Sequence, residues 1–291
     1  MTDLASTPDH RNQLFLFLGS LGLPACFLIC FFILPLGVVW LYSFGTTSGV
    51  VNIEIDGTVR NYARVFESLY LGIIMKSVFI AAVTTILCVA IGFPYAWLMS
   101  FVGSRTRGAL LLAVMLPFWT NLLILTYALM AFLRAEGYIN TAFGWIGVGP
   151  FPLLYNNAAV IIGLVYVHLP FAILPLYAAL DKIDRSMIEA SLDLGAGHFR
   201  TVFHIVVPAC KAGLFSAVFI TFIPALGAFL TPDLLGGPDG QMIASVIDRQ
   251  FKRANNWPFG AALSFLLIYF TIAIILLRNY FDREKVAGAA H

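Results

Sequence analysis

The chain has 291 residues, of which 60% are hydrophobic and only 11% are charged, and its mean hydropathy is +0.90. Soluble domains carry about 25% charged residues, so this composition excludes a soluble enzyme and a disordered chain and predicts an integral membrane protein. The 17 basic and 15 acidic residues leave a net charge of +2, which argues against nucleic acid as a partner.

Six stretches of the chain lack Asp, Glu, Lys and Arg over a length that can cross a bilayer, which takes about 20 residues. We place the spans near residues 15–43, 76–100, 109–133, 158–180, 212–231 and 259–278. This predicts an all-α integral membrane protein with six transmembrane helices. Lys and Arg are more numerous in the segments that lie inside when the N-terminus is cytoplasmic, so we expect both termini to be cytoplasmic.

The longest inner segment, residues 181–211, separates the fourth and fifth predicted spans. Ser186 and Glu189 have the spacing of an S-x-x-E capping box, which predicts a helix from Met187. Gly195 and Gly197 are expected to end that helix, and a second short helical piece is predicted over 198–206, before Pro208. From these features alone, the segment fits an amphipathic helix on the lipid surface as well as a docking site.

The same segment resembles the EAA loop of the membrane subunits of binding-protein-dependent ABC importers. That pattern is E-A-A, a glycine after three residues, and I-x-L-P after nine more; Ser191 replaces the second Ala and Val207 the Leu. In that family the loop contacts the ATPase subunit. The resemblance implies that the following residues couple the chain to an ATPase: Glu189, Ala190, Ser191, Asp193, Leu194, Gly195, Ile205 and Pro208.

Other segments look like the spermidine/putrescine permeases, among them residues 116–121 (LPFWTN), 137–140 (GYIN), 233–237 (DLLGG) and 256–262 (NWPFGAA). This resemblance implies the type I (MetI-like) permease fold of ABC importers, in the bacterial inner membrane. It divides the chain into residues 1–70 with the first helix, a permease core over 71–281, and a cytoplasmic tail over 282–291. One departure is that Leu125 and Thr126 precede Tyr127 where the polyamine permeases tend to have an Arg.

The resemblance also implies the partners and the mechanism. A second homologous permease, an ABC ATPase dimer and a periplasmic solute-binding protein would complete an importer that alternates between inward and outward opening within membrane lipid. The sequence contains no G-x-x-x-x-G-K-[ST] phosphate loop, so ATP and Mg²⁺ are expected on the ATPase, with no cofactor in this chain and no enzymatic activity of its own. The cysteines lack the neighbours that a metal site requires.

Five polar or aromatic residues near the predicted second and third helices are candidates for a solute pathway: Tyr95, Trp97, Trp119, Asn121 and Tyr127. Aromatic faces attract ammonium groups, but Trp and Tyr near helix ends also form the ordinary interfacial belt. The favoured solute is a polyamine. The alternatives are another small nitrogenous solute, amino-acid-derived or opine-like, and a secondary transporter, which would commonly use buried carboxylates that the predicted spans lack.

Overall fold

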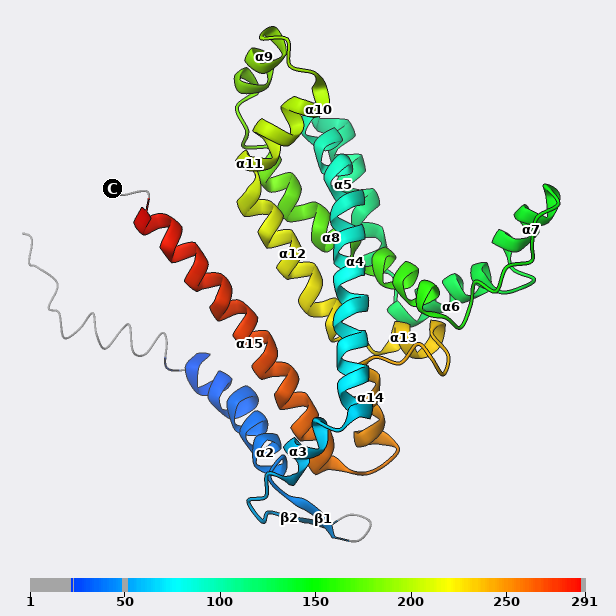
Figure 1. Ribbon diagram of the computed structural model, residues 1–291, viewed down its shortest axis with the longest axis vertical. Coiled ribbons are helices and arrows are strands. Elements are labelled where there is room, and N and C mark those ends of the chain that lie inside the picture. The colour runs from blue at the N-terminus through cyan, green and yellow to red at the C-terminus, as the bar shows by residue number, and fades with distance from the viewer. Residues whose placement is uncertain (1–21, 23, 49–51, 289–291) are drawn as a thin grey trace, which may run out of the picture. The chain divides into compact units, whose positions relative to one another are not determined.

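The computed structural model describes residues 22, 24–48 and 52–288 and is built almost entirely from helices (Figure 1). It contains two compact units. Of the described residues, unit 1 comprises those up to residue 65 and those from residue 250 onward, and unit 2 comprises residues 66–249.

Within the described residues, five helical segments are long and apolar enough to span a membrane: Pro24–Tyr42, Ser68–Phe101, Leu122–Trp145, Asn157–Leu180 and Trp257–Leu276. The third of these contains two helices, of which the first ends at Leu133 and the second begins at Tyr138. A sixth span results if the helices His198–Ala209 and Lys211–Leu226, which are bent by 74° at their junction, are counted as one. The all-α, multi-span prediction is confirmed. The start of the first predicted span, residues 15–21, lies outside the described residues.

The predicted third span, 109–133, is wrong as one continuous helix. The chain instead forms one helix that ends at Trp119 and another that begins at Leu122. Pro117 lies in the last turn of the first helix and has no N–H to donate. Asn121 then caps the second, because its side-chain oxygen accepts a hydrogen bond from the Leu123 N–H at 2.9 Å. The break therefore follows from the sequence PFWTN itself.

Unit 1 combines a helix pair with a small hairpin. Its elements are η1 (Ile29–Ile33), α2 (Leu34–Tyr42), β1 (Thr46–Ser48), β2 (Asn52–Glu54), α3 (Arg60–Val65) and α15 (Trp257–Gly288). The strands pair antiparallel, with Thr47 opposite Ile53. The indole N–H of Trp40 in α2 donates to the Tyr269 hydroxyl in α15 at 2.7 Å, and the Arg64 guanidinium in α3 lies 4.4 Å from the centre of the Phe259 ring.

Unit 2 holds the remaining helices. They are α4 (Ser68–Phe101), α5 (Ser104–Trp119), α6 (Leu122–Leu133), α7 (Tyr138–Trp145), α8 (Asn157–Leu180), α9 (Arg185–Asp193), α10 (His198–Thr201), η2 (Val202–Val206), α11 (Val207–Ala209), α12 (Lys211–Leu226), α13 (Leu230–Leu235) and α14 (Ile243–Lys252), whose last three residues belong to unit 1.

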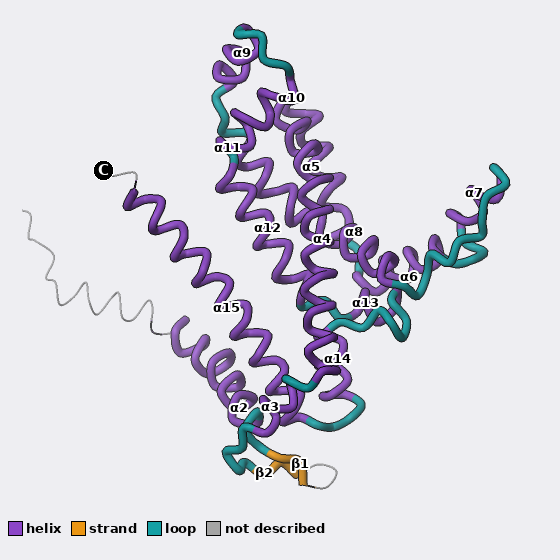
Figure 2. The backbone as a smooth tube through the Cα atoms, viewed as in Figure 1, coloured by secondary structure: helices purple, strands orange, loops and turns teal. Residues whose placement is uncertain are grey.

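Three long helices, α4, α8 and α12, lie side by side and form the centre of unit 2 (Figures 1 and 2). Small residues allow this close packing: a Cβ on Gly213 would lie 2.2 Å from the Ala179 Cβ, and one on Gly92 would lie 3.2 Å from Ile173. Close approach at small residues is how helices associate inside a membrane, where burial from water no longer drives them together.

The core of this helix triad continues into the loop of residues 181–211. Met99 of α4, Leu176 of α8 and Ala217 of α12 share one buried cluster with Val206 of η2, and Ile188 of α9 packs against it. The loop helices are therefore fixed to the spanning helices by apolar contacts as well as by their chain connections.

Candidate functional site

The loop of residues 181–211 lies at one end of unit 2. Figure 1 shows α9 and α10 beyond the ends of α8 and α12, the two helices that the loop connects, and Figure 2 shows the loop segments on either side of α9. The predicted arrangement, with two short helices joined at a glycine bend, is confirmed for this segment.

The start of α9 differs from the predicted capping box. The helix begins at Arg185, and its cap is Asp184, whose carboxylate accepts a hydrogen bond from the Ser186 N–H at 3.0 Å. This hydrogen bond lowers the pKa of the Asp184 carboxyl below its ordinary value, because it favours the charged form. Asp and Ser are comparable N-cap residues, and Asp184 takes the role two residues earlier than Ser186, so the prediction of a Ser186–Glu189 capping box was wrong.

The end of α9 is a Schellman motif centred on Gly195. The Ala196 N–H donates to the Ser191 carbonyl at 3.1 Å, and the Gly195 N–H donates to the Leu192 carbonyl at 2.9 Å. Gly195 has a φ of +82°, a left-handed conformation that glycine adopts at little cost and other residues adopt with strain. The glycine that the EAA pattern specifies therefore has a definite backbone role here.

The second half of the loop is helical from His198 to Ala209 and does not end before Pro208. The π-helical turn η2 precedes the proline, and the Val207 N–H reaches back to the Val202 carbonyl. Such a turn re-routes the backbone hydrogen bonds around a residue that has no N–H. Ile205 is half-buried and Pro208 is exposed, and the chain bends only at Cys210.

Ser191, where the EAA pattern has Ala, joins the two halves of the loop. Its hydroxyl lies 3.0 Å from the Thr201 hydroxyl in α10, and both side chains are buried. A buried hydroxyl without a partner is costly, so Thr201 compensates for the departure from the pattern. Thr201 was missed in the sequence because its role depends on a partner ten residues away.

The rest of α9 presents an outward surface suited to a partner protein. Glu189, Ala190, Asp193 and Gly195 are exposed, and Leu194 is 89% exposed. Phe199, at the start of α10, is 83% exposed and adds a second large apolar side chain that the sequence analysis did not single out. Large apolar side chains at the tip of a polar loop are typical of a protein contact.

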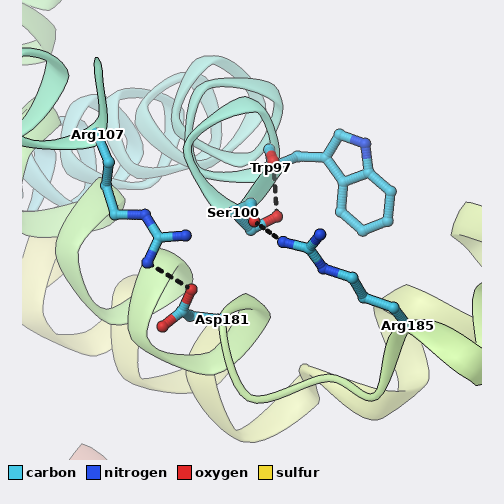
Figure 3. Close-up of polar contacts among 5 residues, drawn as sticks. All are labelled: Trp97, Ser100, Arg107, Asp181 and Arg185. Atoms are coloured by element: carbon cyan, nitrogen blue, oxygen red, sulfur yellow. Dashed lines mark hydrogen bonds and ion pairs between the residues drawn. The ribbon is translucent and has the colours of Figure 1, made fainter. Parts of the chain in front are cut away.

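Two arginines connect the inner ends of the helices (Figure 3). The Arg107 guanidinium of α5 lies 3.3 Å from the Asp181 carboxylate, the residue that follows α8. The Arg185 guanidinium of α9 donates to the Ser100 carbonyl of α4 at 2.8 Å and lies 5.4 Å from the centre of the Phe101 ring. Neither arginine belongs to the EAA pattern.

The five pathway candidates separate into two groups. Tyr95 and Trp97 are half-buried and pack against the central cluster; the Tyr95 hydroxyl donates to the Leu110 carbonyl at 3.0 Å, and Trp97 lies against Phe101. Trp119 is 74% exposed, Tyr127 is 50% exposed, and Asn121 is exposed as well. The exposed three lie at or near the α5–α6 break, and none of them is buried in the chain's own core.

Two adjoining apolar grooves begin at this break and involve α6 and α8. One has a volume of about 240 Å³ and includes Phe118 and Phe171, and the other has a volume of about 480 Å³ and includes Phe132 and Tyr166. Thr120 and Leu125 line both grooves. Leu125 and Thr126, at the position of the expected family Arg, are buried.

Known proteins resemble the chain over most of its length. It is 39% identical over 261 residues to the spermidine/putrescine transport system permease protein PotB of Haemophilus influenzae, covering 89% of this chain and 91% of the relative. It is 36% identical over 266 residues to the protein of the same name from Salmonella typhimurium, covering 88% and 93%.

Among solved structures, the chain superposes on a chain of a bacterial ABC transporter involved in the import of the acidic polysaccharide alginate. The TM-score is 0.72 at 17% identity, covering 94% of this chain and 96% of that one, so the two share the fold of ABC importer permeases. The family model described as "Binding-protein-dependent transport system inner membrane component" matches residues 68–286. The chain therefore belongs to this family, and it is a multi-pass protein of the inner membrane.

Proposed function

We propose that the chain is one of two permease subunits of an ATP-driven importer for polyamines, with a separate ABC ATPase dimer on the inner side and a periplasmic binding protein that delivers the solute. The geometry of the 181–211 loop carries this proposal. The loop carries a short, exposed helix that Asp184 caps and that ends at a glycine with a left-handed backbone. This helix lies at one end of unit 2. Similarity to spermidine/putrescine permeases supports the solute class.

The ATPase would contact α9 and the start of α10. Leu194 and Phe199 offer apolar side chains for a cleft in the partner, and Glu189 and Asp193 offer charges around them. Because Ile188 packs against the core of the spanning helices, a displacement of α9 by the ATPase would reach α4, α8 and α12. ATP and Mg²⁺ would be held by the ATPase. This chain would contribute the helices that move and part of the solute pathway.

The solute would pass along the face that carries the α5–α6 break. A polyamine is a flexible chain of ammonium groups, and its transfer from water into an apolar region needs substitutes for its hydration. Trp119 at the break and Tyr127 in α6 have exposed aromatic rings, and an aromatic ring attracts a cation by about 0.5–2 kcal/mol. Such contacts are strong enough to guide a cation and weak enough to release it. The second permease would close this face from the opposite side.

The test is transport by the whole complex. The chain, its partner permease and the ATPase are reconstituted in vesicles with the cognate binding protein, and uptake of radiolabelled spermidine and putrescine is measured with and without ATP. We expect polyamine uptake that requires both ATP and the binding protein. Uptake of an amino-acid-derived solute in place of polyamines would contradict the solute class, and uptake without ATP would contradict the ATPase coupling.

A further inference from the structure

We propose that Arg185 adds a polar link between α9, the helix that would contact the ATPase, and the spanning helix α4, so that the inner end of α4 follows α9 when the ATPase moves it. This inference rests on the proposed function, and it assigns a transmission role to a residue outside the EAA pattern. It begins from the bond in Figure 3 between the Arg185 guanidinium and the Ser100 carbonyl at 2.8 Å, which joins residues 85 positions apart.

Arg185 gains no stabilisation from the dipole of its own helix. It is the first residue of α9, and the N-terminus of a helix carries a partial positive charge that repels a cation. The C-terminus of α4 offers the opposite environment. That helix ends at Phe101 without a basic residue of its own in its last turn, and its final carbonyls have no partner within the helix.

Arg185 meets both needs of the α4 terminus. Its guanidinium satisfies the Ser100 carbonyl, and its charge lies where the α4 dipole is negative. The Phe101 ring at 5.4 Å adds a cation–π contact. The Ser100 side chain is itself engaged, because its hydroxyl donates to the Trp97 carbonyl at 2.7 Å. The last turn of α4 therefore has one hydrogen bond from a side chain of its own and one from Arg185.

The consequence is mechanical. α4 is a 34-residue helix and packs against both α8 and α12. A pull on its inner end is therefore passed to the whole helix triad. The Arg107–Asp181 pair differs in kind, because it joins α5 to the end of α8 and does not involve α9.

The test compares Arg185→Ala, Arg185→Lys and Arg107→Ala in the reconstituted complex, with uptake and ATP hydrolysis measured together. For Arg185→Ala we expect ATP hydrolysis to continue while uptake per ATP falls about threefold to tenfold, which lies within the range typical of altered coupling between sites. Arg185→Lys should restore part of the loss, since an ammonium can also donate to the Ser100 carbonyl. Arg107→Ala removes a neighbouring charge and should leave uptake per ATP near the wild-type value.

An unchanged ratio in Arg185→Ala, or an equal fall in Arg107→Ala, would overturn the proposal. A distance measurement tests it even if Arg185→Ala fails to assemble. Spin labels on Ser186→Cys in α9 and Leu98→Cys in α4, in a cysteine-free background that keeps Arg185, should keep one separation in the nucleotide-free and ATP-bound states. A separation that changes between these states would overturn the linkage. Failure of the proposed function looks different: the wild-type complex would then hydrolyse ATP without uptake.

Discussion

The 181–211 loop and the α5–α6 break are both exposed regions of unit 2, but they are held in opposite ways. Directional bonds fix the loop: the Schellman motif at Gly195, the Ser191–Thr201 pair and the Arg185–Ser100 bond. The break presents apolar and aromatic side chains, and Asn121 caps only the helix to which it belongs. This difference agrees with the proposed functions, because a surface that transmits force would need one geometry, whereas a surface that passes a flexible cation would need many weak, replaceable contacts.

The largest expected effect comes from Gly195→Val. A β-branched residue at a φ of +82° costs roughly 1–3 kcal/mol, so the end of α9 should unwind and ATP-driven uptake should fall about tenfold or more. ATP hydrolysis and uptake by the reconstituted complex measure the uncoupling. Gly197→Val is the matched control, because Gly197 has an ordinary φ of −66° and open space around it. Equal losses in both variants would contradict a specific role for the glycine conformation.

Trp119→Ala should have an intermediate effect and act on the other region. Loss of one cation–π contact predicts a fall in uptake of about threefold, with ATPase binding unchanged because Trp119 is the last residue of α5 and does not belong to the 181–211 loop. Trp119→Phe, which keeps a ring, should stay closer to the wild type. Trp145→Ala removes another exposed tryptophan, on α7, and should not lower uptake. If Trp119→Ala transports at the wild-type rate, Trp119 is a lipid or packing residue.

The smallest effect is expected from Ser191→Ala, which restores the residue of the EAA pattern. The lost hydrogen bond is worth about 0.5–1.5 kcal/mol, and the Thr201 hydroxyl keeps its bond to the Gly197 carbonyl. Uptake should change less than twofold, whereas amide hydrogen exchange over residues 191–195 should become faster. Exchange that is no faster in the variant would show that the Ser191–Thr201 bond does not hold the loop.

The two regions also differ in how far the sequence predicts them. The helical loop, its glycine end and the apolar spans follow from short-range patterns, namely the charge-free stretches and the spacing from Glu189 to Pro208. The predicted N-cap of α9 was wrong because Asp184 and Ser186, two positions apart, are both suitable N-cap residues, and the helix begins after the first of them. The α5–α6 break was missed because a continuous apolar run hides the combined effect of Pro117 and Asn121.

Contacts between segments that are distant in the chain could not be predicted from the sequence. Arg185 and Ser100 are 85 residues apart, and nothing in the local pattern around either residue identifies its partner. The same holds for the division of the pathway candidates, since the exposure of Trp119 and the burial of Tyr95 depend on how α4, α5 and α8 pack. Helix content is a local property, whereas the roles of single side chains depend on the tertiary arrangement.

The most direct test of the account is whether the 181–211 loop contacts the ATPase. A photoreactive amino acid is placed at Leu194, at the exposed end of α9, or at Trp145 on α7 as the control, in the full complex. The account predicts a cross-link from position 194 to the ATPase subunit that changes in yield with bound nucleotide, and none from position 145. The absence of a cross-link at 194, or equal cross-linking at both positions, would contradict it.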